Sequence, residues 1–396
     1  MARVKDLTEV TLADLWREVK EEFWEDVNTQ TLQLVKRLLE NALEEELVSH
    51  LQATWYQRNP DRQGYRNGYR KRDLFTRWGL LEKLRLPRDR DGRFQSKVLE
   101  RYQRRQEEVN VTIRDLFLRG ISTRKVGEVV QPLLGERVSA QTVSRICYSL
   151  DREVGRYHRR PLVDAYVYLL LDGVTLKVKS STGVKKRLLL CAYGITTAGT
   201  RELLSFRQAS AESEAQWEAF LRDLYERGLT GRSLRLITID GCPGLRGALE
   251  LVYPYVAVQR CWAHKLRNVA AKVPRRCQKE CLAGAKEIYQ ASTQREAKMR
   301  FREWASRWWA VAPKAVHCIE EDLEELLSFI ACPSVHWRRI RTTNAIERAF
   351  REVRRRTRPM SCFQNKESVD RIVFGVISYL NQAWREKPIP EFTHNT

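Results

Sequence analysis

Long apolar runs are missing from this sequence of 396 residues. A membrane-spanning helix needs about 20 consecutive apolar residues, and the longest apolar runs here have the length of single β-strands. The chain starts with the polar segment MARVKDLTEV, which lacks the apolar centre of a secretory signal peptide. We therefore expect no membrane partner and a cytoplasmic location.

Cysteine is present, but not in the pattern of a disulfide framework. The nine cysteines are scattered along the chain, and an odd number cannot pair completely. Disulfide-rich secreted folds are small and use regularly spaced pairs. The cysteines therefore indicate a reducing compartment, in agreement with a cytoplasmic location.

Acidic residues are scarce relative to basic ones. The chain has 50 Asp and Glu against 71 Lys and Arg, a formal net charge of +21. This excess implies a polyanionic partner, most simply DNA or RNA. A generic basic surface is the alternative, but such a surface mixes the two signs more evenly than this chain does.

The charge falls in blocks along the chain. Residues 1–50 hold 12 acidic and 6 basic residues, residues 51–160 hold 26 basic and 13 acidic ones, and residues 338–358 hold nine Arg and two Glu. Charge and hydrophobic periodicity together predict seven consecutive regions. They are an acidic helical dimerisation region (1–53), a basic Arg/Tyr/Gly-rich DNA-binding segment (54–109), a helix-turn-helix-like DNA-binding domain (110–160), the first part of an α/β core (161–261), an α-helical insertion (262–338), C-terminal core helices (339–390) and a tail (391–396).

The acidic region has the periodicity of amphipathic helices. LADLWREVKEEFWEDV and LQLVKRLLENALEEELVSHL, within residues 8–51, both place apolar residues three and four positions apart. Their acidity argues against contact with DNA and favours dimerisation. Packing within the chain's own core explains the spacing equally well.

The basic segment combines Arg, Tyr, Gly and Asn, a mixture that grips phosphates and stacks on bases. Within it, LEKLRLPR predicts a strand that ends at Pro87. A basic, solvated β-hairpin is the alternative. The candidate DNA-contacting residues here are Arg66, Asn67, Arg70, Lys71, Arg72, Arg88 and Arg90.

Residues 110–160 predict a helix, a turn and a second helix. Ser122 and Ser139 are suited to cap the N-termini of two helices around a turn at Gly135. In a DNA-binding helix-turn-helix, the start of the second helix reads base edges. The candidate residues for DNA contact are Arg124, Gln141, Thr142, Ser144 and Arg145. Two packed helices with a glycine turn are also a common structural unit without DNA.

The region after residue 161 alternates between strands and helices. Strands are predicted at 165–172, 174–179, 187–196, 201–208, 233–240 and 255–260, with helices at 212–228 and 243–252. Short links predict an antiparallel meander, and the later strand after a helix predicts parallel pairing. This mixed order is typical of the ribonuclease H-like arrangement, an α/β core. Residues 262–335, 343–357 and 366–386 are predicted helical. We expect the tail PIPEFTHNT to be frayed.

Three acidic residues are the candidate catalytic and metal-binding groups. Asp172 and Asp240 follow the apolar runs YVYLLLDG and LRLITIDG, which predict buried strands that deliver carboxylates to the end of a sheet, and Glu347 lies in TTNAIERAFREVRRR. Clustered carboxylates repel each other, and Mg²⁺ or Mn²⁺ relieves the repulsion. The alternatives are Asp-Gly turns at both aspartates and a capping box between Asn344 and Glu347.

Arginines follow Glu347 on the same predicted helix. Arg351, Arg354 and Arg355 are candidates for contact with a phosphodiester that lies along it.

Cys261 and His264 have a spacing that zinc ligands use, with Cys332 and His336 or Cys277 and Cys281 as further ligands. We favour support of the active site by Cys261 and His264 over zinc binding. A buried structural pair is the other alternative.

Taken in order, the motifs resemble the bacterial transposases of the Mutator-like superfamily, which are insertion-sequence enzymes with a ribonuclease H-like DDE core. The match is carried by YRNGYRKR, PRDRDGRF, GISTRKVGEVVQPLLGERVSAQTVSRI, LLDG, ITIDGCPGL, QRCWAHKLRN and TTNAIERAFREVRRRTR. The resemblance implies that Asp172, Asp240 and Glu347 are the catalytic triad and that Cys261 and His264 form the Cys-x-x-His pattern of the superfamily.

The resemblance also implies an activity. We expect an enzyme that binds the terminal inverted repeats of its element, nicks DNA with two Mg²⁺ or Mn²⁺ ions per active site, and transfers the freed 3′-hydroxyl ends. Double-stranded DNA, a homodimer or larger assembly, and association with the nucleoid follow from this role. The alternatives are a DNA-binding protein without activity and a nuclease that only hydrolyses.

Overall fold

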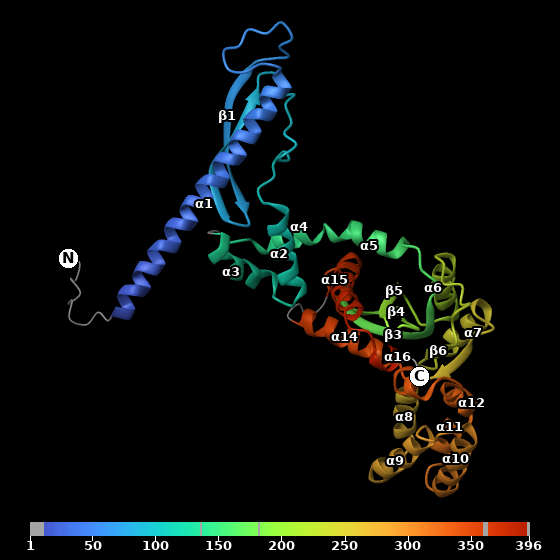
Figure 1. The fold of residues 1–396 in the computed structure, drawn as a ribbon. Coiled ribbons are helices and arrows are strands. Elements are labelled where there is room, and N and C mark those ends of the chain that lie inside the picture. Colours follow the sequence, from blue (N-terminus) through green and yellow to red (C-terminus); the bar gives the residue numbers. More distant parts are fainter. Residues whose placement is uncertain (1–11, 135–136, 181–182, 359–362, 394–396) are drawn as a thin grey trace. The chain divides into compact units, whose positions relative to one another are not determined.

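The computed structural model describes residues 12–134, 137–180, 183–358 and 363–393. The chain divides into two compact units (Figure 1). Met1–Phe117 and Ile121–Cys147 belong to the first, and Leu118–Gly120 and Tyr148–Thr396 belong to the second. In the described part of the chain, no helix has the length and apolar character that crossing a membrane requires.

The first unit contains a long helix and a hairpin. Helix α1 (Leu12–Leu51) is continuous, although two separate amphipathic stretches were visible in the sequence. Strands β1 (Arg66–Thr76) and β2 (Gly79–Asp89) pair antiparallel. Apolar side chains of α1 and the hairpin share a small core, which includes Leu43, Leu74, Leu81, Leu84 and Leu99.

Strand β2 continues past Pro87, where we had predicted its end. Pro87 pairs with Tyr69, and the strand ends at Asp89. A two-stranded sheet consists of edge strands only, and an edge tolerates the missing N–H of proline.

Three short helices complete the first unit: α2 (Glu107–Leu118), α3 (Thr123–Leu134) and α4 (Ala140–Cys147). The two predicted N-caps are confirmed. The N–H of Lys125 donates to Ser122 Oγ at 3.3 Å, and that of Thr142 donates to Ser139 Oγ at 3.2 Å. The single helix predicted after Ser139 is interrupted near Tyr148, at the boundary between the units, and α5 (Leu150–Arg159) follows.

A five-stranded mixed sheet forms the centre of the second unit, with the strand order β5-β4-β3-β6-β7. Strands β3 (Tyr166–Ser180), β4 (Gly183–Thr196) and β5 (Arg201–Ala209) form the predicted antiparallel meander. Strands β6 (Leu236–Ile239) and β7 (Ala257–Arg260) add in parallel, as predicted. The two strands predicted at 165–172 and 174–179 are one strand, β3.

The two faces of this sheet differ. Leu169, Leu171 and Ile237 belong to a buried apolar cluster with Trp217 and Phe220 of α6 (Glu214–Glu226). Helix α7 (Pro243–Val252) contributes to the same cluster. Because side chains alternate along a strand, the residues between these apolar positions point to the opposite face.

Helices of the C-terminal half follow β7 in two groups (Figure 1). The first group is α8 (Trp262–Ala271), α9 (Gln278–Ile288), α10 (Gln294–Trp308), α11 (Pro313–Glu320), α12 (Leu323–Leu327) and α13 (Trp337–Ile340). The second group, α14 (Asn344–Thr357) and α15 (Lys366–Arg385), returns to the sheet, where α14 contacts β3 and α15 contacts β5.

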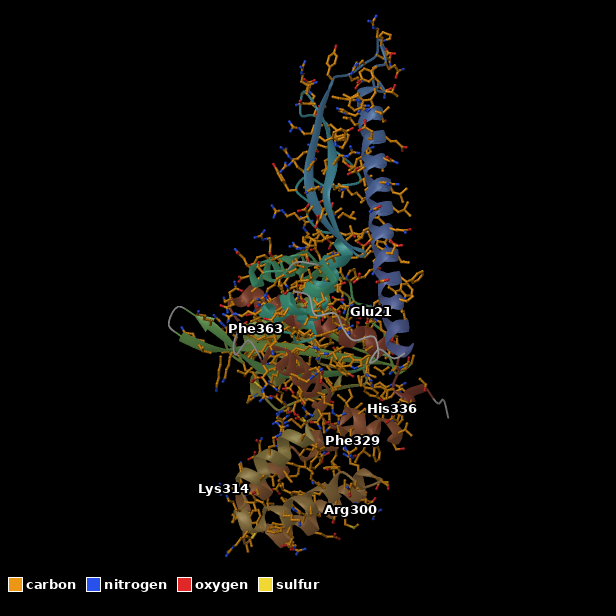
Figure 2. All side chains as sticks on the ribbon, turned by 90° about the vertical axis from the view of Figure 1, so that its left-hand side faces the viewer. Glu21, Arg300, Lys314, Phe329, His336 and Phe363 are labelled. Carbon is orange, nitrogen blue, oxygen red and sulfur yellow. The ribbon has the colours of Figure 1, made fainter. Side chains whose placement is uncertain are left out.

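The expectation of a frayed tail is wrong for residues 390–393, and residues 394–396 lie outside the described part. Helix α16 (Pro390–Thr393) ends the described chain, and Phe392 is buried. The ring of Phe392 stacks on His336, which Figure 2 labels, with centroids 3.8 Å apart. Aromatic stacking and burial hold this segment in place.

Candidate active site

The register of two parallel strands places the two candidate aspartates next to each other. Leu170 of β3 pairs with Thr238 of β6, and Asp172 and Asp240 each follow two residues later. Neighbouring strands in register point equivalent side chains to the same face. Both aspartates therefore lie on the face opposite the α6–α7 core.

The sequence predicts Asp172 at the end of a strand, and this prediction is wrong. Asp172 pairs with Cys191 in the middle of β3, and its side chain is buried, with 4% exposed. Asp240 follows the last residue of the much shorter β6. The Asp-Gly turn alternative is wrong for Asp172, whereas the Asp240 carboxylate accepts a hydrogen bond from the N–H of Cys242 at 3.0 Å, as in a turn.

Glu347 reaches the site from the first turn of α14. The segment before this helix is tied to the sheet and to α8: Thr238 Oγ1 donates to the carbonyl of Ile340 at 2.5 Å, and the N–H of Trp262 donates to the carbonyl of Arg341 at 3.1 Å. Thr343 occupies the N-cap position of α14 without a side-chain cap hydrogen bond, and Asn344 is the first residue of the helix, so the capping-box alternative is wrong.

These elements bring Glu347 and Asp172 together with His264 of α8. One potential ligand atom from each of the three residues lies within 4.8 Å of the others. Glu347 Oε1 accepts a hydrogen bond from Arg267 at 2.5 Å and lies 3.7 Å from His264 Nε2. Asp240 is not a member of this group, but its charge acts on Asp172.

Burial and charge shift the protonation equilibria of the site. Burial raises the pKa of Asp172 to about 7, and the charges of Asp240 and Glu347 add to the rise, against the lowering by His264 and Thr343. A hydrogen bond to Cys261 raises the pKa of His264 to about 9. The negative charges of Asp240 and Glu347 thus oppose ionisation of Asp172. The raised pKa of His264 favours a positively charged imidazolium beside these carboxylates.

The potential ligands that lie together are the carboxylates of Asp172 and Glu347 and the imidazole of His264, and this donor set fits a divalent cation. Oxygen ligands of carboxylates suit Mg²⁺ and Mn²⁺. Ionisation of the buried Asp172 is opposed by desolvation and by two neighbouring carboxylates, and a cation removes that penalty.

Comparison with known proteins assigns the chain to a family. The model of the family described as "Transposase, Mutator family" matches residues 8–387. The chain belongs to the Mutator family of transposases. It is 35% identical over 354 residues to the transposase for insertion sequence element ISRM5 of Rhizobium meliloti, with 89% of this chain and 88% of that protein covered.

Two further relatives match this Mutator-family chain over a similar share of its length. The transposase for insertion sequence element IS256 in transposon Tn4001 of Staphylococcus aureus is 34% identical over 366 residues, 91% of each chain. The transposase for insertion sequence element IS406 of Burkholderia multivorans is 34% identical over 350 residues, 88% of this chain and 89% of the relative.

Cys261 and His264 of the Mutator-family chain lie beside the carboxylates. The N–H of Thr343 donates to Cys261 Sγ at 3.3 Å, and Thr343 Oγ1 lies 3.5 Å from His264 Nδ1. Among the described residues, the only cluster of three or more metal-ligating side chains is the one with Asp172. His336, named above as a possible further ligand of the less favoured zinc site, lies with Nδ1 2.9 Å from the hydroxyl of Tyr168.

Glu212 is a further acidic residue near the site, and no motif in the sequence singles it out. Its carboxylate stands 2.6 Å from where a side chain at Gly173 would begin. Burial, followed by the charge of Asp240, raises the pKa of Glu212. The one sequence signal was an acidic residue just before helix α6, which is also the ordinary place for a residue that complements a helix N-terminus.

The candidate residues of the hairpin differ in exposure. The side chain of Arg66 pairs with Glu44 at 2.6 Å and is only 8% exposed, and Arg72 Nη2 donates to the carbonyl of Glu100 at 3.3 Å. The remaining candidates are exposed: Asn67, Arg70, Lys71, Arg88 and Arg90.

The candidates of α3 and α4 are mostly exposed. These are Arg124, Gln141, Ser144 and Arg145. Thr142 is half-buried, with its hydroxyl 3.0 Å from that of Ser139.

The arginines after Glu347 line a groove in the second unit. Arg351, Arg354 and Arg355 face this cavity of about 580 Å³ together with Lys177 of β3. Arg355 also pairs with Glu352 at 3.0 Å. The basic residues of the groove therefore come from β3 and α14, the two elements that carry Asp172 and Glu347.

Proposed function

We propose that this Mutator-family chain is a metal-dependent DNA transposase. It binds the terminal inverted repeats of its insertion sequence, nicks DNA strands and joins the freed 3′-hydroxyl ends to other DNA. The observation that carries the proposal is the convergence of Asp172 and Glu347, with Asp240 in register, on one face of a mixed sheet. The antiparallel meander followed by parallel strands supports a ribonuclease H-like core with α8–α13 as its insertion.

In this proposal, Asp172, Asp240 and Glu347 hold two Mg²⁺ or Mn²⁺ ions. Bound divalent ions activate a water or 3′-hydroxyl nucleophile and stabilise the leaving 3′-oxygen of an in-line displacement. With a divalent cation bound, Asp172 would be held as a carboxylate, because the cation would offset the burial and the neighbouring charges that raise its pKa. Arg267, which pairs with Glu347, and His264 would then be free to contact the phosphate, and Cys261 and Thr343 would keep the imidazole oriented.

The basic surfaces serve DNA binding in the same proposal. The exposed residues at the start of α4 contact base edges, and the exposed cations of the hairpin and of α14 contact phosphates. Removal of Arg145 then relaxes discrimination at one base position by about 1–3 kcal/mol.

Helix α1 supports assembly of two copies. Its described part leaves large apolar side chains exposed, namely Val19, Phe23, Trp24, Leu34 and Leu38. These recur at helical spacing on a helix that otherwise packs on the hairpin. We infer that this face pairs with the same face of a second copy in a homodimer or larger assembly. Work on chromosomal DNA implies a cytoplasmic, nucleoid-associated location.

A cleavage and strand-transfer assay tests the function. Purified chain is incubated with Mg²⁺ or Mn²⁺ and labelled DNA that carries the ends of its element, beside the Asp172→Asn variant. We expect a metal-dependent nick with a 3′-hydroxyl that then joins target DNA, absent with the variant. Specific binding without a nick supports the DNA-binding alternative, and nicking without joining supports a plain nuclease.

A further inference from the structure

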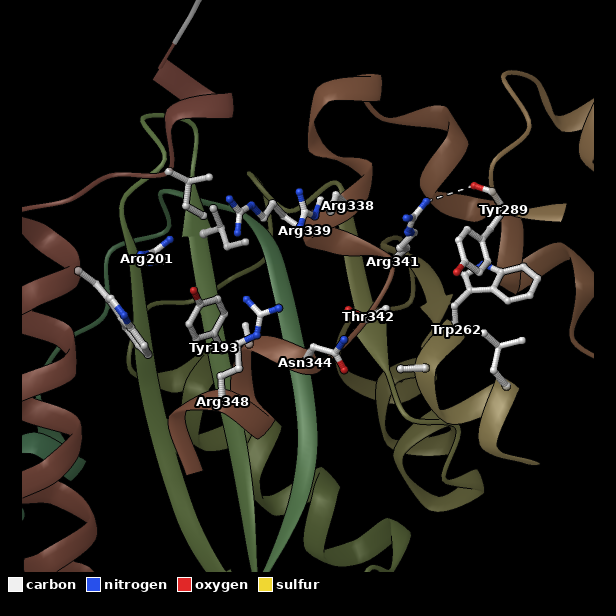
Figure 3. A pocket seen from close by; sticks show the side chains of 16 residues that line it. Tyr193, Arg201, Trp262, Tyr289, Arg338, Arg339, Arg341, Thr342, Asn344 and Arg348 are labelled. Atoms are coloured by element: carbon white, nitrogen blue, oxygen red, sulfur yellow. Dashed lines mark hydrogen bonds between the residues drawn. The ribbon is translucent and has the colours of Figure 1, made fainter. Parts of the chain in front are cut away.

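A second cavity lies next to the carboxylates, on the same face of the sheet. It has a volume of about 460 Å³, which is in the range of small-molecule sites. Five arginines and no acidic residue occur among the described residues that line it. Figure 3 shows Tyr193, Arg201 and Arg348 on one side and Trp262, Tyr289 and Arg341 on the other.

The positive charge of this arginine pocket is only partly neutralised by the chain itself. Arg339 pairs with Glu391 at 2.7 Å, and Arg341 donates to the carbonyl of Tyr289 at 3.2 Å. Arg338 and Arg348 are exposed and, within the part of the chain that the structure describes, form no ion pair. Planar guanidinium groups without a carboxylate partner are suited to phosphate.

Aromatic rings form two walls of the pocket. Trp262 and Tyr289 pack with centroids 5.0 Å apart, and the guanidinium of Arg341 lies 4.3 Å from the centre of the Tyr289 ring. On the other wall, Tyr193 and Trp384 pack at 5.5 Å. Tyr289 and Trp384 are half-buried, so both retain exposed surface. A ligand with a phosphate and a flat base matches this combination better than a small inorganic anion.

The pocket adjoins the carboxylates through three elements. Tyr193 lies two residues after Cys191, the partner of Asp172, which is about 7 Å along strand β4. On α8, Ala263 and Leu266 line the pocket, whereas His264 and Arg267 face Glu347.

Asn344 and Arg348 line the pocket from the same turn of α14 that carries Glu347. A DNA strand with its phosphodiester at the carboxylates therefore reaches the pocket with an adjacent nucleotide.

We propose that the arginine pocket binds one unpaired nucleotide of a DNA strand, adjacent to the phosphodiester that is cut. The proposal rests on the proposed function for its meaning, but the binding itself needs neither metal nor cleavage. The cavity holds a single nucleotide and not a duplex, so the base must be unpaired before it enters. Arginines hold the phosphate, and Tyr289 or Trp384 stacks on the base.

Photo-crosslinking of the full chain tests the pocket. The probe is a single-stranded oligodeoxythymidylate of twelve nucleotides with 5-iododeoxyuridine at one internal position, mixed with the Asp172→Asn variant without metal. We expect mass spectrometry to find crosslinked peptides that contain Tyr289 or Trp384. The double change Arg338→Ala and Arg348→Ala removes these crosslinks. It also lowers the salt slope of binding by about 0.7, the contribution of one phosphate contact to a single strand, because both arginines hold the phosphate of the same nucleotide.

Arg302→Ala is the matched control, because Arg302 is an exposed arginine on α10 outside the pocket. We expect it to retain the pocket crosslinks. Trp384→Leu keeps all the arginines and reduces the crosslinks at that wall. Absence of crosslinks in the pocket peptides or an equal loss with Arg302→Ala overturns the proposal. So does stronger crosslinking to either of two comparison probes of the same length and with the same iodinated base, an oligouridylate and a DNA duplex.

The two proposals fail separately. Crosslinks in the pocket together with no nick in the cleavage assay contradict the catalytic function alone. Cleavage and joining by the wild-type chain without crosslinks in the pocket contradict the pocket alone.

Discussion

Two Asp-Gly pairs that look alike in the sequence have different structures. Asp172–Gly173 follows YVYLLL and runs on inside a strand of 15 residues. Asp240–Gly241 follows LRLITI and lies directly after a strand of four residues. Gly241 has φ +107°, in the region that favours glycine, and the Asp240 carboxylate accepts from the N–H of Cys242. The same dipeptide is thus extended in one place and a turn in the other.

The residues that follow decide the difference. After Gly173, Val174, Leu176 and Val178 are buried at alternate positions, a pattern that continues a strand. After Gly241, Pro243 occupies the first turn of α7, where proline favours a helix start. The parallel register nevertheless brings both aspartates to one place. A carboxylate can therefore reach an active site with or without a turn.

The largest expected effect is a loss of cleavage that is the same for both aspartates, although their local structures differ. Asp172→Asn and Asp240→Asn should each reduce strand cleavage about a thousandfold or more, because a metal ion supplies several kcal/mol of transition-state stabilisation. The measurement is the rate of nicking at saturating Mg²⁺, with DNA affinity measured in parallel. A loss of DNA binding equal to the loss of cleavage would assign either aspartate to structure instead.

The effects of the two Asp→Asn substitutions on the free energy of unfolding should differ by a few kcal/mol. The folded pKa of Asp172 is about 7, above its ordinary value of 3.8, so its contribution to stability is present below about pH 4 and is lost as the pH rises through 7. Without metal, Asp172→Asn should therefore raise the free energy of unfolding at pH 8, at about 1.36 kcal/mol per unit of pKa difference, but not at pH 4.

Urea unfolding followed by tryptophan fluorescence measures this difference at both pH values. Asp240→Asn keeps an oxygen that accepts from Cys242 and should change stability by less than about 1 kcal/mol. Glu226→Gln, at an exposed position of α6, is the control for loss of one charge. A stabilisation by Asp172→Asn that does not depend on pH would contradict the burial argument.

The two glycines should give a smaller contrast. Gly241→Ala should destabilise the fold by about 1–3 kcal/mol, because φ is positive and the new Cβ would lie 2.5 Å from Arg260 Nη1. At Gly173 the backbone is extended, and the clash at 2.6 Å is with the carboxylate end of Glu212. Gly173→Ala should therefore displace Glu212 at little cost in stability, and thermal unfolding of the two variants compares them. Equal losses in the two variants would contradict the argument that the positive φ makes glycine more necessary at position 241 than at position 173.

Sequence patterns predict those elements of the fold for which a single local signal decides the secondary structure. The helix caps at Ser122 and Ser139, the meander and the parallel strands followed from capping chemistry and periodicity. The continuity of β3 through Gly173 did not, because an Asp-Gly pair is an equally good turn signal. The burial of Phe392 depends on a partner, His336, more than fifty positions away in the sequence.

The candidate site shows the same limit. The contexts of Asp172, Asp240 and Glu347 singled these residues out, but their proximity depends on the register of β3 with β6 and on the path of α14. Glu212 has an ordinary position before a helix and reaches the site only through the packing of that loop on Gly173. Arg66 lies in a segment whose composition is typical of DNA contact, but its side chain forms an ion pair with Glu44 of α1.

A change of metal preference tests the central claim most directly. Asp172→Cys replaces a hard oxygen with a thiolate, which binds Mg²⁺ poorly and softer metals better. We predict that this variant does not cleave DNA with Mg²⁺ and regains part of its cleavage with Mn²⁺ or Cd²⁺, while Asp172→Ala regains none with any of the three. Cleavage by Asp172→Cys with Mg²⁺ at the wild-type rate would contradict the claim that Asp172 holds the metal at the active site.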